Sequence, residues 1–439
     1  MIRPALARRL GLLLTLTFPL AVVVACSDDE AAPPPPSGDA GPAEAGTDSA
    51  PANSDAGADA ANDATGLRLG RLTNKSILAT SVDGRKLYGW GTNIFRLIRQ
   101  DLPDHHERPV ASDIDGIPGE PLKLVASTND KACILGESGK MWCWGDTGAN
   151  DSLGVGDGES RAAATPIAQG EMPEGTKIVA FDVYPYGACV VGDDGEAYCW
   201  GDRNRVPSLD GGLHTRVVPE RVRRGEIPGE ARIVDVSTAI NRTCLLAEGR
   251  AYCFFNGQPE RVDEGELPAG SKLLALRIND DFSCSVADDG DIYCWGSASG
   301  RAFGNGSSDF KSSAPYTRVS RKNLPAGVTF KDVAVGGVSS ATCGLGTDGW
   351  AYCWGSGANG AAGDDDVSDH DVLEPRPVVR GDVPEGVTFV RLGCGTYHCN
   401  AEGSDHVIYS WGGNEDGVLA VPRTTSSSGR PVRMSPLEE

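Results

Sequence analysis

The sequence predicts an all-β protein: a seven-bladed β-propeller with disulfides in its hairpins, preceded by a signal peptide and a disordered linker. A Trp-Gly anchor motif returns at nearly regular intervals, and period-two alternation around Gly- and Asp-rich turns indicates β-hairpins. The 439 residues include 57 Gly and 28 Pro, which is an unusually turn-rich composition. Together these observations exclude a long helical protein.

The charge of the chain excludes one class of partner. Lys and Arg number 40 against 61 Asp and Glu, so the formal net charge is −21. A nucleic-acid-binding protein needs a basic surface to neutralise phosphates. We therefore expect no nucleic-acid partner.

The N-terminal segment has the pattern of an export signal. Three arginines precede an apolar stretch at 10–25, and small or β-branched residues stand directly before Cys26. This arrangement resembles the bacterial lipobox, in which cleavage leaves an acylated Cys at the new N-terminus. We interpret 1–25 as a lipoprotein signal peptide and Cys26 as the lipidation site. The alternative is a membrane helix with an incidental Cys, but sixteen apolar positions are short for a span.

The next segment, 26–66, is predicted to be a disordered tether. From residue 27 onward it holds 12 Ala, 6 Pro, 5 Gly and 9 acidic residues, without a single Lys or Arg. Such a composition lacks the bulky side chains that would offset the entropy of ordering, and its like charges repel one another. We expect a bacterial cell-envelope protein that contacts the membrane only through its lipid anchor. Ser27 in place of Asp favours the outer membrane.

The region 67–439 contains seven repeats. The aromatic anchors lie 54, 56, 54, 41, 59 and 57 residues apart, and the anchor segments are 87–91, 141–145, 197–201, 251–255, 292–296, 351–355 and 408–412. A Pro-Gly-type turn precedes most hairpins, and a Pro-Val or Pro-Ile pair marks a further strand, which gives three or four strands per repeat. Units of this kind must stack to bury their faces. Because 431–434 supplies a Pro-Val strand at the end of the chain, we expect it to complete the first blade and close the ring.

The repeats resemble those of the regulator of chromosome condensation family. The similarity lies in the Trp-Gly anchor followed by a Gly-rich segment, best preserved at 150–156, and it extends from about residue 67 to 434. This resemblance implies a seven-bladed propeller. Eukaryotic members catalyse nucleotide exchange on a nuclear GTPase, a role that an exported acidic lipoprotein cannot share. Exported bacterial members include an inhibitor of β-lactamase, so the resemblance also implies that such a disc can bind an enzyme.

The cysteines are predicted to form six disulfides. Thirteen Cys minus the lipidated Cys26 leave an even number, which suits an oxidising compartment. In five repeats a Cys lies on each arm of a hairpin, where directly opposed residues are close enough for a disulfide. In the seventh repeat Ser410 replaces the second Cys, Cys399 is taken to keep the first position, and Cys394 is its expected partner. The pairs are Cys133–Cys143, Cys189–Cys199, Cys244–Cys253, Cys284–Cys294, Cys343–Cys353 and Cys394–Cys399.

The sequence contains no recognisable catalytic motif. Nucleophile elbows, phosphate-binding loops, zinc-protease and EF-hand patterns are absent, and the six histidines have no metal-ligand spacing. Closely spaced Cys pairs of the zinc-binding kind are also absent. We therefore expect neither an enzyme nor a cofactor or metal.

Binding is expected on the variable loops that follow the anchors, at 92–107, 146–162, 202–216, 297–313, 356–373 and 413–429, with only 256–258 in the fourth repeat. Among these loops, the highest density of charged side chains is found in an acidic run. This run either binds Ca²⁺ or a basic partner, or it is simply solvated. Its members are Asp364, Asp365, Asp366, Asp369 and Asp371.

The sequence predicts a tethered, monomeric, non-catalytic propeller that binds an extracytoplasmic protein or ligand. The alternative is an envelope polysaccharide hydrolase or lyase with an acidic site on a face or in the central channel.

Overall fold

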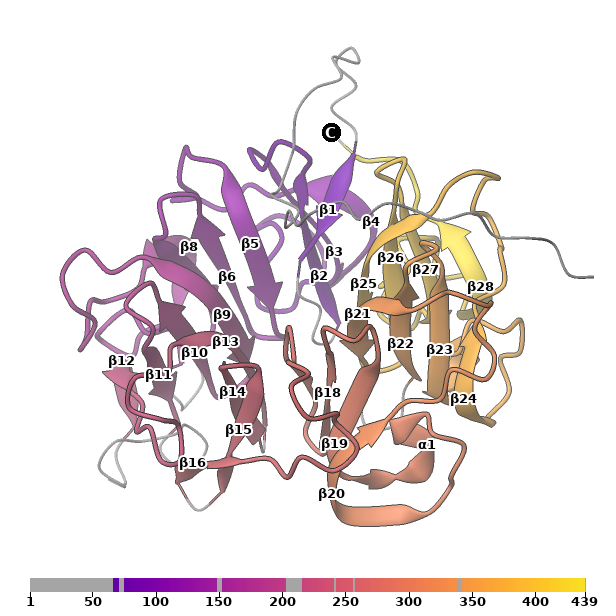
Figure 1. Ribbon diagram of the computed structural model, residues 1–439. Helices are drawn as coiled ribbons and strands as arrows, with labels where there is room; N and C mark the ends of the chain where they lie inside the picture. Colours follow the sequence, from indigo (N-terminus) through magenta and orange to yellow (C-terminus); the bar gives the residue numbers. More distant parts are fainter. Residues whose placement is uncertain are drawn as a thin grey trace, which may run out of the picture. The chain divides into compact units, whose positions relative to one another are not determined.

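The propeller fold is confirmed. A computed structural model describes residues 66–70, 75–147, 152–202, 215–240, 242–255, 257–337 and 341–438. Seven four-stranded antiparallel sheets surround a central axis (Figure 1), and each sheet contains four strands that are consecutive in the chain. Each repeat predicted from the sequence is thus one blade.

The first four blades have the following strands. Blade 1 contains β1 (Leu67–Leu69), β2 (Ser76–Ser81), β3 (Leu87–Thr92) and β4 (His105–Ala111), and blade 2 contains β5 (Leu122–Ser127), β6 (Lys131–Gly136), β7 (Met141–Gly145) and β8 (Arg161–Pro166). Blade 3 contains β9 (Ile178–Tyr184), β10 (Gly187–Gly192), β11 (Ala197–Gly201) and β12 (Arg216–Arg221), and blade 4 contains β13 (Ile233–Ala239), β14 (Arg242–Ala247), β15 (Arg250–Phe255) and β16 (Gln258–Arg261).

The last three blades follow the same order. Blade 5 contains β17 (Arg277–Ile278), β18 (Phe282–Val286), β19 (Ile292–Ser299) and β20 (Phe310–Arg318), and blade 6 contains β21 (Phe330–Val335), β22 (Ala341–Gly346), β23 (Ala351–Ser356) and β24 (Asp371–Pro377). Blade 7 contains β25 (Phe389–Cys394), β26 (His398–Gly403), β27 (Ile408–Gly413) and β28 (Ser427–Arg433). Short helical turns are α1 (Gly300–Phe303) and η1 (Ala358–Gly360), and none of the described helices is long and apolar enough to cross a membrane.

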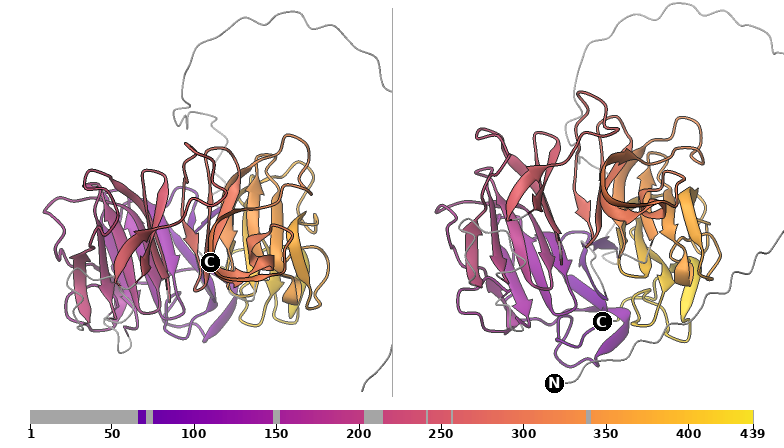
Figure 2. Two further views of the ribbon diagram at one scale, coloured as in Figure 1. Left: turned by 60° about the horizontal axis from the view of Figure 1, so that its bottom comes forward. Right: turned by 90° about the horizontal axis from the view of Figure 1, so that it is seen from below.

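The antiparallel order gives the propeller two distinct faces. Figure 2 shows the ring from two further directions. The first strand of each blade is the innermost one, and all seven first strands begin on the same face. That face also holds the turns between second and third strands, so we call it the hairpin face. The opposite face holds the connections between third and fourth strands, and we call it the loop face.

The expected route of ring closure is wrong. Pro431 and Val432 lie in β28, which is the outermost strand of blade 7 and pairs with β27. Blade 1 already has its own Pro-Val strand, β4, which contains Pro109 and Val110. A proline thus lies in the outermost strand of every blade, including the first, and no strand position of blade 1 is left for the C-terminus to fill.

Blades 1 and 7 are instead joined by individual contacts. The amide N–H of Leu67 donates to the carbonyl of His406 at 3.1 Å. The amide N–H of Leu69 donates to the carboxylate of Glu402 at 3.3 Å. The C-terminal tail adds one parallel bridge between Glu438 and Val110. The ring is thus closed by hydrogen bonds between blades and not by a shared sheet.

Each anchor tryptophan fastens its blade to the preceding one. Six anchor tryptophans are at most 2% exposed, and five of their indole N–H groups donate to carbonyls in the loop that follows the preceding anchor. The donor–acceptor pairs are Trp90–Val418, Trp144–Leu97, Trp200–Ser152, Trp354–Ala302 and Trp411–Ala361, at 2.9 to 3.1 Å. In blade 5 the indole N–H of Trp295 instead donates to the sulfur of Cys253 at 3.5 Å.

All six predicted disulfides are confirmed. Five join directly opposed residues on the second and third strands, with Cα atoms 4.0 to 4.2 Å apart. In the fourth blade the shortened turn at Glu248 and Gly249 has positive φ at both residues, as the two-residue turn requires. This shortening keeps Cys244 opposite Cys253.

The position assigned to Cys399 is wrong, although its partner is correct. Cys399 lies opposite Trp411, whereas Asn400 lies opposite Ser410 and accepts a hydrogen bond from its hydroxyl. Asn400 therefore occupies the usual first Cys position. The Cys394–Cys399 bond joins β25 to β26 and lies on the other face of the sheet, in the interface with blade 6. There the sulfur of Cys399 is 3.6 Å from that of Cys343.

Candidate functional site

The central channel is lined by the innermost strand of every blade. Its main cavity has a volume of about 330 Å³ and is bordered by Leu69, Leu124, Asp182, Ser237, Thr238, Arg277, Asp332 and Arg391, among others. A second cavity of about 120 Å³ shares Thr238, Ile278, Val335 and Cys394 with the first. Cavities of the first size accommodate small ligands or a few side chains.

The carboxylates of the channel are already used to join blades. Asp182 accepts hydrogen bonds from the Ser237 hydroxyl at 2.8 Å and from the Thr238 amide at 2.9 Å, both in the next blade. Asp332 accepts the Val333 amide at 2.8 Å, and the Arg277 guanidinium lies 3.5 Å away. Because these groups are engaged in this way, the channel lacks a free acid–base pair among its described residues.

The Thr238 hydroxyl in the channel has no hydrogen-bond partner in the part of the chain that the structure describes. Thr238 is 4% exposed, and its hydroxyl makes no hydrogen bond among the described residues. It borders both cavities. A buried hydroxyl is usually hydrogen-bonded, so the channel offers a site for an added donor or acceptor.

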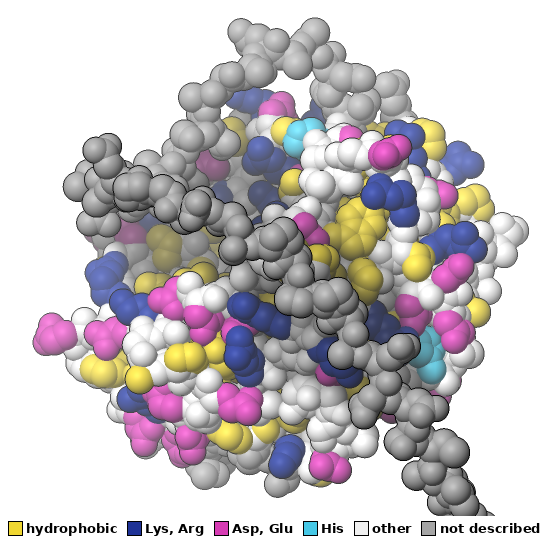
Figure 3. Space-filling model, turned by 45° about the vertical axis from the view of Figure 1, so that its right-hand side comes forward, with side chains coloured by type: hydrophobic (Ala, Val, Ile, Leu, Met, Phe, Trp, Pro, Cys, Tyr) yellow, Lys and Arg dark blue, Asp and Glu magenta, His cyan; other side chains and the backbone are white. Residues whose placement is uncertain are grey.

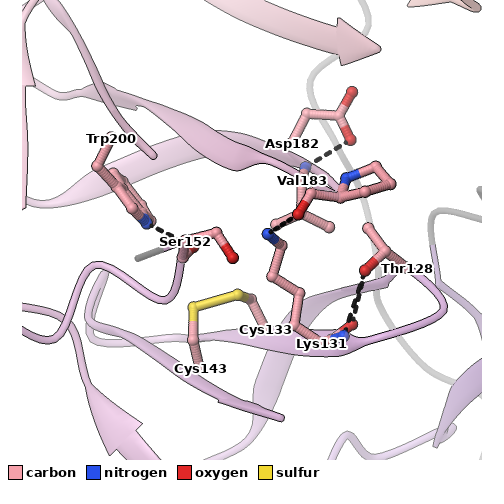
Figure 4. Close-up of a disulfide and its surroundings, with 9 residues drawn as sticks. Thr128, Lys131, Cys133, Cys143, Ser152, Asp182, Val183 and Trp200 are labelled. Atoms are coloured by element: carbon pink, nitrogen blue, oxygen red, sulfur yellow. Dashed lines mark hydrogen bonds between the residues drawn. A yellow bond between two sulfur atoms is a disulfide. The ribbon is translucent and has the colours of Figure 1, made fainter. Parts of the chain in front are cut away.

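Two buried bases lie near the loop face. Lys131 is fully buried beside the Cys133–Cys143 disulfide (Figure 4), and its ammonium donates to the Pro185 carbonyl at 3.0 Å. Burial lowers the pKa of Lys131 to about 7. His398 is 3% exposed at the seam between blades 7 and 1, and burial lowers its pKa to about 4. Both positions thus disfavour the charged form of the side chain.

The hairpin-face mouth of the channel carries exposed apolar side chains in equivalent positions. In β9, β13 and β25 the pairing with the second strand skips one residue after the first residue pair, which forms a β-bulge. The skipped residues are Val179, Val234 and Val390. A bulge turns a side chain away from the regular sheet. These residues are 42%, 52% and 42% exposed, and the equivalent Leu274 is 58% exposed. Blades 3, 4 and 5 thus present three neighbouring apolar residues.

The loops predicted to carry recognition lie on the loop face, and their central residues are buried. Leu97, Leu153, Phe303, Ala361 and Leu419 are at most 1% exposed, because each loop packs under the tryptophan of the next blade. Residues 148–151 and 203–214 of these loops lie outside the described residues. Recognition by the exposed remainder of the loops stays a prediction.

The acidic run lies in the connection between β23 and β24 and ends at Asp371, the first residue of β24. Asp364 is 3.0 Å from the His370 imidazole, Asp365 is 2.9 Å from the Arg430 guanidinium, and Asp371 pairs with Arg301. Asp366 accepts the Ser368 amide, and Asp369 is exposed. Most of these carboxylates therefore have cationic or N–H partners, and their role in binding Ca²⁺ or a partner stays a prediction.

The neighbours of His370 in this loop raise the pKa of its imidazole. Partial burial acts to lower the pKa of His370, but hydrogen bonds to the Ser368 carbonyl and the Asp364 carboxylate outweigh it and raise the pKa above its ordinary value.

Among the described residues, one group of three potential metal ligands converges: Cys343, Cys394 and Cys399. Their sulfurs are engaged in disulfides, which cannot serve as thiolate ligands. Cys26 lies outside the described residues, so lipidation is a prediction from the sequence alone.

Comparisons with known proteins support a similarity to propellers of the regulator of chromosome condensation type. No family model matches the chain. The chain is 26% identical over 385 residues to the human E3 ubiquitin-protein ligase HERC2, covering 80% of this chain but only 7% of the ligase. It is 24% identical over 337 residues to the ultraviolet-B receptor UVR8 of Arabidopsis thaliana, covering 72% of this chain and 71% of the receptor.

Solved structures support the same fold. Human WBSCR16 superposes with a TM-score of 0.64 at 14% identity, covering 80% of this chain and 94% of that one. Prp20p of Saccharomyces cerevisiae, described with its binding to Gsp1p and histones, superposes with a TM-score of 0.63 at 18% identity, covering 82% and 87%. At these identities the likeness concerns the fold alone.

Sequence reasoning missed the hairpin-face mouth. Its residues lie in ordinary short strands, whereas the longer loops vary more from repeat to repeat. A position-by-position alignment of the inner-strand segments would have shown an apolar residue one position after the first buried residue in blades 3, 4, 5 and 7, and a Lys or Arg there in blades 1, 2 and 6.

Proposed function

We propose that this protein is a lipid-anchored, non-catalytic binding propeller of the bacterial cell envelope, whose partner is an extracytoplasmic protein that docks over the hairpin-face mouth of the channel. The observation that carries this proposal is the row of exposed apolar side chains at Val179, Val234 and Leu274 on three consecutive blades. Single exposed apolar residues are common, but neighbouring ones in equivalent positions are typical of interaction surfaces.

Known relatives of the same fold lend support. Prp20p is described as binding Gsp1p and histones, so a propeller of this type can bind proteins. The carboxylates of the channel are engaged in contacts between blades, which speaks against the polysaccharide hydrolase or lyase.

The tether and the compartment are part of the proposal. Cys26 follows a leader of lipobox type, and six disulfides suit an oxidising compartment. Mass spectrometry of the N-terminal peptide tests lipidation, with detergent partitioning as a second readout. Cys26→Ala should move the protein from the membrane to the soluble fraction. An unmodified Cys26 in membrane-free protein would contradict the anchor.

Affinity capture from envelope extract tests the binding function. We expect a stoichiometric protein partner that is lost from a Val179→Ser/Val234→Ser/Leu274→Ser variant. The control is Phe310→Ser/Val367→Ser, which removes exposed apolar side chains elsewhere. A partner retained equally by both variants would place binding away from the mouth. Turnover of an envelope polysaccharide that is abolished by Asp364→Asn/Asp366→Asn would overturn the non-catalytic proposal.

A further inference from the structure

A ring of exposed cations surrounds the hairpin-face mouth of the channel. Each blade contributes one Lys or Arg within two positions of the first buried residue of its innermost strand, and every one of these side chains is exposed. We call them the cation ring; its members are Arg68, Lys123, Lys177, Arg232, Lys272, Lys331 and Arg391. A protein with a net charge of −21 thus places a basic side chain near the start of the innermost strand in all seven blades. It stands one residue before the first buried residue in blades 3, 4 and 5, one residue after it in blades 1, 2 and 6, and two residues after it in blade 7.

We propose that the cation ring binds an acidic segment of a polypeptide partner. This inference deepens the proposed function and rests on it, because it adds the chemistry of the partner to the place where it docks.

The cations of the ring are largely free to meet a ligand. Within the described part of the chain, Arg68, Lys123, Lys177, Lys272 and Lys331 form no ion pair. Arg232 donates to the backbone carbonyls of 193–194, and Arg391 lies 3.5 Å from Glu402. The nearest turn carboxylates accept the backbone N–H groups of Lys177 and Lys272 and leave the ammonium groups unpaired.

Arginines farther from the axis provide the contrast. Arg221 and Arg224 both lie 2.7 Å from Glu196, and Arg318 and Arg321 both pair with Asp291. Figure 3 shows how widely Lys and Arg are intermixed with Asp and Glu on the side of the molecule that it draws. The ring is therefore distinguished by five cations that form no ion pair within the described residues, each close to the start of an innermost strand.

The outer zone of the hairpin face favours a narrow acidic partner over a broad anionic surface. Four carboxylates there accept the backbone N–H of the next blade's outermost strand, which fixes them far from the axis: Glu171, Glu226, Glu266 and Asp382. An anionic bilayer laid across the face would meet these acids as well as the ring. A single acidic segment over the channel avoids these four outer acids. Like charges repel and opposite charges steer association.

The apolar residues and the channel further restrict the chemistry of the partner. Val179, Val234 and Leu274 lie two residues after Lys177, Arg232 and Lys272 in the sequence, so in these three blades a cation and an exposed apolar side chain stand on either side of one buried residue. Below them, Arg277 and Arg391 border the cavity of about 330 Å³, together with the unpartnered Thr238 hydroxyl. A segment with both carboxylates and apolar side chains matches this surface, and one carboxylate side chain fits the cavity.

The test uses two labelled twelve-residue peptides, one of alternating Glu and Leu and one with Gln in place of Glu. The protein is tested as the full chain and as the quadruple variant Lys123→Gln/Lys177→Gln/Lys272→Gln/Lys331→Gln. The matched control, Arg85→Gln/Lys86→Gln/Lys140→Gln/Lys311→Gln, removes the same charge from exposed sites outside the ring. Fluorescence anisotropy at low and moderate salt gives the dissociation constants, and circular dichroism confirms that each variant is folded.

We expect the Glu peptide to bind at least about tenfold more tightly than the Gln peptide, and the ring variant to lose at least about tenfold in affinity, while the control stays within about twofold. Equal losses in the ring and control variants would overturn the proposal. Ring-dependent sedimentation with vesicles containing phosphatidylglycerol, without peptide binding, would overturn it in favour of a membrane surface. A captured envelope partner that binds the ring variant normally would refute this inference and leave the proposed function standing.

Discussion

The two faces of the propeller use their side chains differently. On the loop face, the long connections look variable in sequence, yet their central residues are buried and accept the indole hydrogen bonds that join blades. On the hairpin face, the short inner strands look regular, yet they expose unpaired cations and apolar side chains. Sequence variability is thus a poor guide here, because a loop can vary while its backbone carbonyl performs a constant structural task. We expect changes on the loop face to cost stability and changes on the hairpin face to cost binding.

The largest stability loss is expected at an anchor tryptophan. Trp411 is fully buried and its indole donates to the Ala361 carbonyl at 3.1 Å. Trp411→Ala removes this bond and leaves a cavity between blades 6 and 7, which costs about 3–5 kcal/mol of the free energy of unfolding. Denaturant titration of the two proteins measures it. A loss no larger than that of an exposed control such as Lys140→Ala would show that the loops do not hold the ring.

His398 should make the seam between blades 7 and 1 sensitive to acid. Its pKa is about 4 in the folded protein against an ordinary value of 6.5, so the unfolded chain binds the proton first as the pH falls. The stability that depends on neutral His398 is complete above pH 6.5 and is lost as the pH falls toward 4. His398→Gln should therefore reduce the loss of stability over this window by up to about 3 kcal/mol.

His370 is the control for His398, because its contribution to stability should change with pH in the opposite direction. Its pKa is raised by its partners Ser368 and Asp364, so its contribution is present at low pH and is lost as the pH rises. His370→Gln should lower stability at pH 5 relative to pH 8, by less than the effect at His398 because the loop is partly solvated. Urea titrations across this pH range measure both variants. Parallel pH profiles for the two would contradict the assignment of His398 as a buried neutral base.

The disulfide of blade 7 should contribute less to the free energy of unfolding. Cys394 and Cys399 are five residues apart, so the bond closes a short loop, and the chain-entropy relation gives about 2 kcal/mol at most. Cys394→Ser/Cys399→Ser should lower the free energy of unfolding by that amount or less. Cys189→Ser/Cys199→Ser is the matched pair on the second and third strands of blade 3. Ellman titration after unfolding without reductant checks for free thiols, and thiols at these positions in wild-type protein would contradict the bond.

Lys131 is expected to oppose folding at neutral pH. Its pKa is lowered from 10.5 to about 7, so the unfolded chain binds more protons between these values and stability rises with pH across that window. At pH 6, Lys131→Met should raise the free energy of unfolding by about 1–2 kcal/mol, because it removes a buried charge. Lys140→Met, an exposed lysine of the same hairpin, should change little. Destabilisation by Lys131→Met would show that the hydrogen bond to the Pro185 carbonyl outweighs the burial of the charge.

The fold and the disulfides could be predicted because both follow from local, repeated patterns. The spacing of the anchor motifs set the number of blades, and directly opposed Cys residues set five disulfides. The blade to which the last strand belongs could not be predicted. A Pro-Val strand at the end of the chain has the same sequence pattern whether it completes blade 1 or blade 7. The position of Cys399 failed for a similar reason: a one-residue difference in register reverses the face of the sheet and is invisible without the pairing of Asn400 with Ser410.

The site was harder to predict than the fold because it depends on closing the ring. Lys123 and Lys331 are far apart in the sequence, and each is an unremarkable lysine within a short strand. They form one surface only once the innermost strands surround the channel. The acidic run was conspicuous in the sequence, but the arginines that reach it, Arg301 and Arg430, come from other segments.

The smallest effect on stability is expected at the hairpin face, and it is the sharpest test of the contrast between the faces. Val234 is 52% exposed in a bulge of β13, so little apolar burial is lost on substitution. Val234→Ser should change the free energy of unfolding by no more than about 0.5 kcal/mol, yet weaken capture of the partner, because the side chain belongs to the apolar row at the mouth. A large loss of stability would mean that the bulge is part of the structural framework, and unchanged capture would mean that the partner does not touch blade 4.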